Sequence, residues 1–536
     1  MPSADSIILG GDIVTVAGPA AEAVAVTGGR VTAAGSRAEV LEAKGPATEV
    51  VDLRGAALLP GFIEPHTHPD SSAQCYSWVD VSGFTHASVE SVEKALRDAV
   101  EAAAPGKWVF AFGLDAMLTS NLGHWDRHRL DLMAPDNPVC VMIQSMHTLF
   151  VNSAALRAAG IDSNTPDPAG GGRFMRDESG EPSGIIMEQP AVQRFMSFLD
   201  LSPEAWVKRL GDQYGRYRAV GVTTVGIAGI FTPRPLLPML EEVTTRDDAV
   251  RAVAYRHHTL TGNDWEPADE TGRFRLQGVK LWYDGSPYSG TMLLDDPYVD
   301  SDLCCQTLGI APGTSGHANI GPEELVTALE EYRERGWQVL THAQGDRGTR
   351  EVLDAYEKVL RGHGDSDHRW RLEHCALISR DDVARAARLG VALSFHVNHV
   401  YYYGPELRES IIGPERAEAM MPLGSAVRAG HRISLHADSP MYPANPLSLM
   451  KTAVTRLTRA GDQLGAAEAI STEQALRAVT IDAAWQLFAE GDVGSIEAGK
   501  FADFVILERN PLNVAAEELA GIEVLGTWLA GRPRAS

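Results

Sequence analysis

The stretch Leu58–Asp70, LLPGFIEPHTHPD, begins as an apolar run typical of a buried strand and ends with two histidines separated by one residue. Successive side chains of a strand point to opposite faces, so His66 and His68 project in the same direction. Two imidazoles on one face can bind one cation. The pair alone does not distinguish a metal site from two packed or surface histidines.

Seven further segments are apolar enough on both faces to be buried strands, at 222–229, 251–258, 276–286, 337–346, 370–377, 391–399 and 431–439. Segments with helical periodicity, such as 321–336 and 379–390, separate most of them. Eight strands that alternate with helices predict an α/β fold of the (β/α)8, or TIM, barrel type.

Three regions do not follow this alternation. Residues 1–57 and 489–536 contain short alternating strands punctuated by glycine, which predicts a composite β-sandwich domain built from both termini. The barrel is then expected to span 58–488. Residues of about 75–220 have strand-like pieces of their own at 107–115 and 137–147 and a glycine-rich turn at 168–184, and are predicted to form a large insertion after the first barrel strand.

The composition excludes several classes of protein. A formal net charge of −24, with no basic stripe, disfavours nucleic acid as a partner. No apolar run approaches the roughly 18 residues of a membrane helix, and the opening residues lack signal-peptide features, so we expect no membrane partner and a cytoplasmic location. The 5 cysteines show no C-x-x-C spacing, so the sequence does not indicate a thiolate zinc site. A homodimer is the default expectation for the assembly.

Four further residues with metal or acid–base chemistry fall near the carboxyl ends of predicted barrel strands. Lys280 lies on the fourth strand, His342 ends the fifth, His374 ends the sixth and Asp438 ends the eighth. Active sites of this architecture are built at that end of the barrel. Together with the first-strand histidines, these residues predict a centre for zinc or a similar divalent ion.

Lys280 has two interpretations, because an ammonium group is not a metal ligand. Burial lowers the pKa of a lysine, and the neutral amine can add carbon dioxide to give a carbamate, a carboxylate that is able to bridge two cations. Alternatively, Lys280 is an ordinary buried lysine paired with an acid such as Asp284.

The order of motifs along the chain is more specific than any single one. GFIEPHTH, VKLWYDGS, THAQGD, LEHC and HADSP, followed by VGSIEAGKFADFVIL, span almost the whole sequence. This order resembles the amidohydrolase superfamily and, within it, the amidohydrolase-3 group that includes YtcJ-like proteins and N-substituted formamide deformylases. The resemblance implies metal ligands at His66, His68, Lys280, His342, His374 and Asp438.

The resemblance also implies a role for each ligand. His66 and His68 would hold the more buried metal, a carboxylated Lys280 would bridge both metals, and His342 and His374 would bind the second. Asp438 would bind metal and act as the catalytic base and acid. The implied cofactors are two zinc ions per chain, with Mn, Fe or Co as alternatives, and a carbamate formed from carbon dioxide on Lys280.

Two positions depart from the family pattern. Glu64 stands where aspartate is more familiar in the first motif, and His436 stands where a small residue often precedes the eighth-strand aspartate. We expect His436 to turn away from the barrel mouth and pack. Candidate substrate contacts are His147 in the insertion and His396, His399 and Tyr402 after the seventh strand, with simple packing as the alternative for each.

These observations predict a metal-dependent hydrolase of non-peptide C–N bonds, in which metal-activated hydroxide attacks the carbonyl carbon. The substrate expected is a small neutral amide, foremost a linear amide such as an N-substituted formamide. The alternatives are a hydrolase of cyclic amides or imides, as in hydantoinase-like relatives, a deaminase, or, more remotely, a non-catalytic binding protein.

Overall fold

The computed structural model describes residues 3–146, 148–168, 172–200, 202–230, 232, 234–258, 272–361 and 367–534. The chain forms two compact units, one made of Met1–Asp70 with Leu210–Ser536 and the other of Ser71–Arg209.

The larger unit contains an eight-stranded sheet in which all neighbouring strands are parallel. Its strands are β6 (Phe62–Thr67), β13 (Val222–Ala228), β14 (Arg251–His257), β15 (Phe274–Trp282), β16 (Gln338–Ala343), β17 (Arg371–His374), β18 (Ala392–Phe395) and β19 (Ser434–Leu435). They follow one another in chain order around the sheet. The eight-stranded parallel barrel predicted from the sequence is therefore confirmed.

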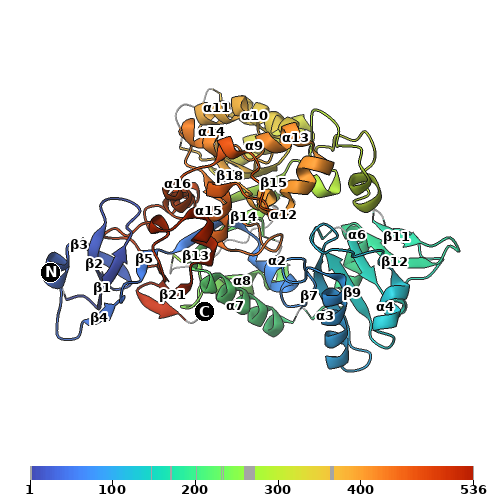
Figure 1. Cartoon of the computed structure of the whole chain (residues 1–536), viewed down its shortest axis with the longest axis horizontal. Helices are drawn as coiled ribbons and strands as arrows, with labels where there is room; N and C mark the ends of the chain where they lie inside the picture. The colour runs from blue at the N-terminus through green and yellow to red at the C-terminus, as the bar shows by residue number, and fades with distance from the viewer. Residues whose placement is uncertain are drawn as a thin grey trace. The chain divides into compact units, whose positions relative to one another are not determined.

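Helices lie between and after these strands in the order expected for the barrel (Figure 1). They are α7 (Pro203–Ala219), α8 (Leu237–Thr244), α9 (Pro322–Glu334), α10 (Asp346–Leu360), α11 (Arg380–Leu389), α12 (Asn398–Glu406), α13 (Pro414–Ala419), α14 (Leu423–Arg428), α15 (Pro446–Thr455), α16 (Thr472–Ala478) and α17 (Ile481–Gln486). The segments predicted to be helical at 321–336 and 379–390 are α9 and α11. Ser379 caps α11 through the amide of Asp382, and Gly390 ends that helix in the left-handed conformation.

The barrel is closed by side-chain and loop contacts where its two end strands meet. Among the described residues, β6 and β19 share no ladder of strand hydrogen bonds. The buried carboxylate of Glu64 instead accepts a hydrogen bond from the amide of Ala437 at 3.2 Å, and the amide of His68 donates to the carbonyl of Ser439 at 2.9 Å. Glu64 thus ties the first strand to the segment that carries Asp438.

The opening stretch of the sequence is two strands rather than the single strand expected. Residues Ala57–Pro60 form β5, which belongs to the terminal sheet, and β6 begins at Phe62 in the barrel. A Cβ on Gly61 would come within 2.2 Å of the Thr223 side chain, so only glycine fits between the two strands. Pro60, which lacks an amide hydrogen, also cannot extend the ladder into β6.

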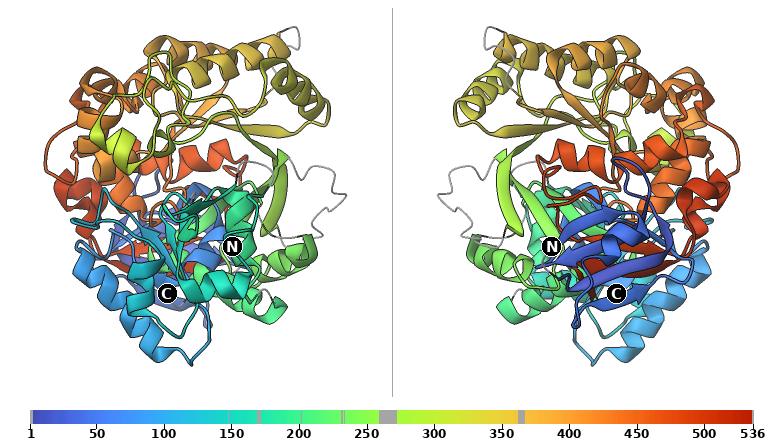
Figure 2. Two further views of the ribbon diagram at one scale, coloured as in Figure 1. Left: turned by 90° about the vertical axis from the view of Figure 1, so that its right-hand side faces the viewer. Right: turned by 90° about the vertical axis from the view of Figure 1, so that its left-hand side faces the viewer.

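Strands from both ends of the chain form a second eight-stranded sheet. Its members are β1 (Ser6–Ile13), β2 (Ala21–Thr27), β3 (Arg30–Gly35), β4 (Glu49–Asp52), β5, β20 (Phe504–Leu507), β21 (Val524–Leu529) and β22 (Arg532–Arg534). The link is made where β20 pairs antiparallel with β5, so that blue and red strands lie together in the right-hand view of Figure 2. The short helix α1 (Arg37–Leu41) follows β3. The arrangement of these strands as a sandwich stays a prediction.

The smaller unit has a six-stranded mixed sheet of its own, in the order β11-β12-β10-β9-β8-β7. The strands are β7 (Val79–Asp80), β8 (Val109–Leu114), β9 (Val139–Ile143), β10 (Thr148–Val151), β11 (Arg173–Arg176) and β12 (Pro182–Met187). Its helices are α3 (Val89–Ala102), α4 (Arg127–Met133), α5 (Ser153–Ala159) and α6 (Gln189–Met196), and α2 (Pro69–Cys75) leads into it. Alternate residues of β9 feed different apolar clusters, Val139 and Val141 one and Cys140 and Met142 the other, so this sheet is buried on both faces.

One detail of this region differs from the expectation. The glycine-rich turn expected at 168–184 includes an antiparallel pair, β11 with β12, joined by a tight turn at Asp177.

Within the described part of the chain, no helix combines the length and the apolar character needed to cross a membrane.

Candidate metal centre

The predicted ligands come from five strands of the barrel and the segments that follow them. His66 lies in β6 and His68 directly after it, Lys280 in β15, His342 in β16 and His374 at the end of β17, and Asp438 follows β19. The structure brings these side chains together. The ring centroids of His66 and His374 are 4.7 Å apart, and those of His342 and His374 are 4.2 Å apart.

The ring of His66 is held by a buried carboxylate that the sequence analysis did not single out. Nδ1 of His66 contacts Oε2 of Glu373, and Glu373 also pairs with the guanidinium of Arg371, with Nε 2.7 Å from Oε1. All three side chains are buried. Burial acts to raise the pKa of Glu373, but Arg371, His66 and Lys280 together outweigh it and lower the pKa to about 2. An ionised Glu373 accepts a hydrogen bond from Nδ1–H of His66. The lone pair of the neutral ring is then on Nε2.

Asp438 lies at the point where the first-strand histidines converge. Its Oδ1 is 3.1 Å from Nε2 of His68 and 3.4 Å from Nε2 of His66. Asp438 adopts a left-handed backbone conformation with φ of 57°, which is uncommon for this residue type and common at functional sites. Burial raises the pKa of Asp438, but the two histidines outweigh it and hold the pKa well below its usual value.

Several candidate ligand atoms lie close together without forming hydrogen bonds to one another, as expected for a metal site. Oδ1 of Asp438 and Nε2 of His374 are buried and have no hydrogen-bond partner among the described residues. Groups of three ligand atoms within 4.8 Å of one another include those of His66, His68 and Asp438. Imidazole nitrogens and a carboxylate oxygen are the ligands that zinc and similar ions prefer. Buried polar atoms that converge without bonding each other are expected where a cation binds.

Lys280 is fully buried beside the first-strand histidines. Its Nζ lies 3.2 Å from Nε2 of His66, and burial lowers the pKa of Lys280 to about 8. The alternative pairing with Asp284 is not found in the described structure, since that carboxylate accepts hydrogen bonds from the amides of Gln344, Gly345 and Leu293. The amine therefore faces a ligand nitrogen instead of a counter-ion.

His342 is oriented by a backbone carbonyl. Its Nε2 donates to the carbonyl oxygen of Gly285 at 3.2 Å, so the lone pair is on Nδ1. Oδ1 of Asp284 lies 3.7 Å from the same Nε2. Burial raises the pKa of Asp284 to about 7, although backbone amides act to lower it.

His436 lies inside the cluster, which contradicts the expectation that it turns away and packs. The side chain is fully buried, its ring stacks on that of His66 with centroids 4.6 Å apart, and its Nε2 is 3.2 Å from Nδ1 of His374. Period-two alternation counted back from Asp438 places residue 436 on the same face, so the sequence did contain the signal.

The candidate substrate contacts differ from one another. His396 donates Nε2–H to the carbonyl of Ala437 at 3.0 Å, and its buried Nδ1 has no hydrogen-bond partner among the described residues. His399 instead uses both nitrogens, Nδ1 with the hydroxyls of Tyr288 and Tyr442 and Nε2 with the side-chain oxygen of Gln344. His396 thus keeps a ring nitrogen for a bound group, whereas His399 is committed within the protein.

Two further candidates complete the comparison with the sequence. Tyr402 stacks on Tyr442, with centroids 5.2 Å apart, and Tyr442 in turn contacts the ring of His396. Tyr402 is therefore one ring removed from that histidine. His147 lies outside the described residues.

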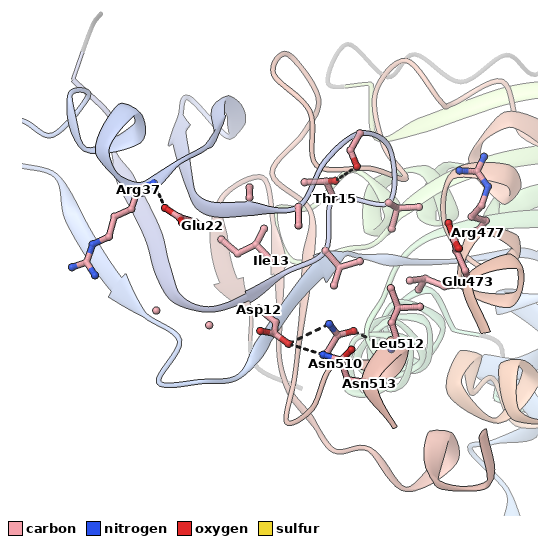
Figure 3. A pocket seen from close by; sticks show the side chains of 18 residues that line it. Asp12, Ile13, Thr15, Glu22, Arg37, Glu473, Arg477, Asn510, Leu512 and Asn513 are labelled. Carbon is pink, nitrogen blue, oxygen red and sulfur yellow. Dashed lines mark hydrogen bonds between the residues drawn. The ribbon is translucent and has the colours of Figure 1, made fainter. Parts of the chain in front are cut away.

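A surface pocket of about 720 Å³ lies between β1, α16 and the C-terminal segment (Figure 3). Asp12 accepts hydrogen bonds there from the side-chain amides of Asn510 and Asn513, at 3.2 and 3.3 Å. Its lining contains no histidine or cysteine, so it offers no ligand set like the one in the barrel.

Comparisons with known proteins agree with this geometry. A model described as "Amidohydrolase family" matches residues 49–535. The chain is 31% identical to an N-substituted formamide deformylase of Arthrobacter pascens, over 91% of this chain and 90% of that protein. It is 27% identical to the putative amidohydrolase YtcJ of Bacillus subtilis strain 168, over 91% and 90%. A crystal structure of an uncharacterised metal-dependent hydrolase from Pyrococcus horikoshii OT3 aligns with a TM-score of 0.75 at 24% identity, covering 95% of this chain and 99% of that one.

Proposed function

Because the chain belongs to the amidohydrolase family and is a hydrolase that acts on carbon–nitrogen bonds, we propose that it hydrolyses a small linear amide of the N-substituted formamide type. The observation that carries the proposal is the position of Asp438, whose unpartnered Oδ1 faces the Nε2 atoms of His66 and His68. The relative from Arthrobacter pascens supports the substrate class.

The residues that would hold the metal are His66, His68, Lys280, His342, His374 and Asp438. When bound, a divalent ion supplies Lewis acidity, which acidifies water and polarises a carbonyl group. We take zinc as the native ion, with Mn, Fe or Co as alternatives that the same donors accept. A carbamate on the buried Lys280 amine would add a carboxylate ligand and so allow the same residues to hold a second ion.

Asp438 carries the proton in the proposed reaction. With Oδ1 directed at the histidines, Oδ2 takes a proton from water as its oxygen bonds to the carbonyl carbon. As the C–N bond breaks, the same oxygen gives the proton to the departing nitrogen, so that a formamide yields an amine and formic acid, which then loses its own proton to solvent. The amine leaves neutral, and Asp438 returns to its ionised form.

Two measurements test the proposal in sequence. Elemental mass spectrometry on protein purified without chelators or added metal should give two equivalents of zinc per chain. One equivalent would contradict the bridging carbamate, and none would contradict metal dependence altogether. The metal-loaded protein is then assayed with N-substituted formamides against hydantoins, lactams and aminated bases, and faster turnover of the formamides is expected. Preference for a cyclic amide or for deamination would overturn the linear-amide assignment.

The proposal also covers the partner, assembly and location of the enzyme and the residues that contact its substrate. We propose a small neutral amide as its partner, a homodimeric assembly and a cytoplasmic location, without nucleic-acid or membrane partners. His396 is the residue we assign to substrate contact, because its buried Nδ1 lacks a protein partner among the described residues. Tyr402 and His147 stay predicted substrate contacts.

A further inference from the structure

We propose that His396 accepts a hydrogen bond from the N–H group of the substrate, so that the enzyme requires a secondary amide, one that carries a hydrogen on its nitrogen. This inference deepens the proposed function and rests on it. Formamides with one substituent on nitrogen meet the requirement. N,N-disubstituted formamides and formate esters have no such hydrogen and do not meet it.

His396 borders the candidate metal centre. It follows β18 directly, and its side chain is 1% exposed. His374, His396 and Asp438 each offer one candidate ligand atom, and these three atoms lie within 4.8 Å of one another. A substrate that reaches Asp438 therefore comes close to the ring of His396.

The hydrogen of the His396 ring is on Nε2. This atom lies 3.0 Å from the carbonyl oxygen of Ala437, and a carbonyl oxygen only accepts, so the contact uses a hydrogen on Nε2. Burial lowers the pKa of His396 to about 4, and the ring is therefore neutral at pH 7 with a single hydrogen. Nδ1 then has a lone pair and acts only as an acceptor.

The described residues provide no donor for this acceptor. Nδ1 of His396 is buried and has no hydrogen-bond partner among them. The rings of Tyr442 and His399 lie close by, with centroids 4.9 and 4.4 Å away, but their polar atoms bond to other groups. The Tyr442 hydroxyl contacts Nδ1 of His399, and Nε2 of His399 bonds to the side-chain oxygen of Gln344. A buried acceptor without a donor costs free energy, so we expect a bound group to supply the hydrogen.

A formamide can supply that hydrogen only from its nitrogen. Its carbonyl oxygen accepts, and the lone pair on Nδ1 of His396 repels it, whereas an N–H group donates. The bond to Ala437 also fixes His396 beside the proposed base, because Asp438 is the next residue of the chain. The hydrogen held by His396 stays on the nitrogen throughout, and the proton that Asp438 delivers becomes the second hydrogen of the product amine.

The test compares an N-substituted formamide with the formate ester of the same substituent, in which oxygen replaces the N–H group. His396→Phe removes the acceptor and should lower kcat/KM for the formamide by roughly 10–100-fold. The value for the ester should stay close to that of the wild type. His396→Asn keeps an acceptor oxygen near the position of Nδ1 and should recover most of the formamide activity.

The matched control is His431→Phe. His431 also bonds through Nε2 to a backbone carbonyl, that of Val383 at 2.9 Å, so its replacement removes the same kind of hydrogen bond from the fold. Both substrates should be hydrolysed by His431→Phe as they are by the wild type. Elemental analysis of each variant should give the wild-type metal content.

Three results would overturn the inference. Equal losses for the formamide and the ester in His396→Phe would mean that His396 acts on water or on the fold, and unchanged activity on both would mean that it does not act. Loss of metal from the same variant would make His396 a metal ligand.

A measurement on the wild type covers the case in which His396→Phe fails to fold. The N-methyl derivative of the same formamide lacks the N–H group and should be hydrolysed much more slowly than its parent. Equal turnover of the two amides would overturn the inference while leaving the proposed function intact. A metal-loaded wild-type protein that hydrolyses no formamide would instead overturn the proposed function.

Discussion

Two histidines of the metal centre have their second nitrogens held in different ways. Nδ1 of His66 faces Glu373, an ionised carboxylate balanced by Arg371, which together we call the charged support. Nδ1 of His374 faces His436, the first member of an uncharged chain that continues through Ser394, Ser434 and Gln486 and that we call the neutral support. Both supports contact the Nδ1 atom of their histidine, and for His66 this leaves Nε2 directed at Asp438.

The two supports should differ in strength and in what they do to the ligand. A carboxylate partner makes an imidazole more basic and a better donor to a cation, whereas a neutral imidazole does so less. The charged support also requires burial of two ions, which is stable only while both are present. The neutral support contains no buried ion that could lose its partner. Its stability depends instead on the hydrogen bonds between its buried side chains. If two metals bind as proposed, their positions are therefore predicted to be held unequally.

The largest effect is expected from the residue that both histidines approach. Asp438→Asn should keep the metal content of the wild type but lower kcat on an N-substituted formamide by about 10²–10⁴-fold, because an amide cannot accept the proton of water. The measurement is steady-state turnover together with elemental analysis of the same sample. Unchanged turnover with full metal content would exclude Asp438 as the base.

The charged support should be the more costly to break in the folded protein. Glu373→Gln leaves the buried guanidinium of Arg371 without a counter-ion and should lower the free energy of unfolding by about 3–5 kcal/mol. Chemical denaturation of the metal-free protein measures it, so that lost metal binding does not contribute.

A surface ion pair provides the matched control. Asp295 pairs with Arg350 at 2.6 Å, with side chains 45% and 42% exposed, and Asp295→Asn should cost no more than about 1 kcal/mol. Equal losses in Glu373→Gln and Asp295→Asn would mean that Arg371 is compensated by other groups, and the contrast between the supports would fail.

The sequence predicted the parts of this centre that depend on position along strands. The apolar runs located all eight barrel strands, and the histidines predicted at the carboxyl ends of these strands, His66, His342 and His374, converge in the structure. Such predictions work because a strand that is buried on both faces is recognisable from its own residues, without knowledge of its neighbours.

The sequence did not predict Glu373, because strand alternation places adjacent residues on opposite faces. The structure brings both Glu373 and His374 against His66, and His374 has a left-handed backbone with φ of 76° that breaks the alternation at the end of β17. A departure of this kind depends on the tertiary surroundings of the strand end and has no local signature. The division of the opening stretch at Gly61 is similar, because the close approach of Thr223 comes from a distant part of the chain.

The smallest effect is expected in the neutral support, and it tests whether the two supports differ as argued. Ser434→Ala removes one buried hydroxyl and leaves the side-chain oxygen of Gln486 without its donor, which should lower the free energy of unfolding by about 1–3 kcal/mol. Ser183→Ala is the control: it removes a partly exposed hydroxyl that donates to the carbonyl of Met175 and accepts from the amide of Ile185, and it should cost less than Ser434→Ala. A loss in Ser434→Ala as large as that in Glu373→Gln would show that the uncharged chain matters as much as the ion pair, and the predicted difference between the two supports would fail.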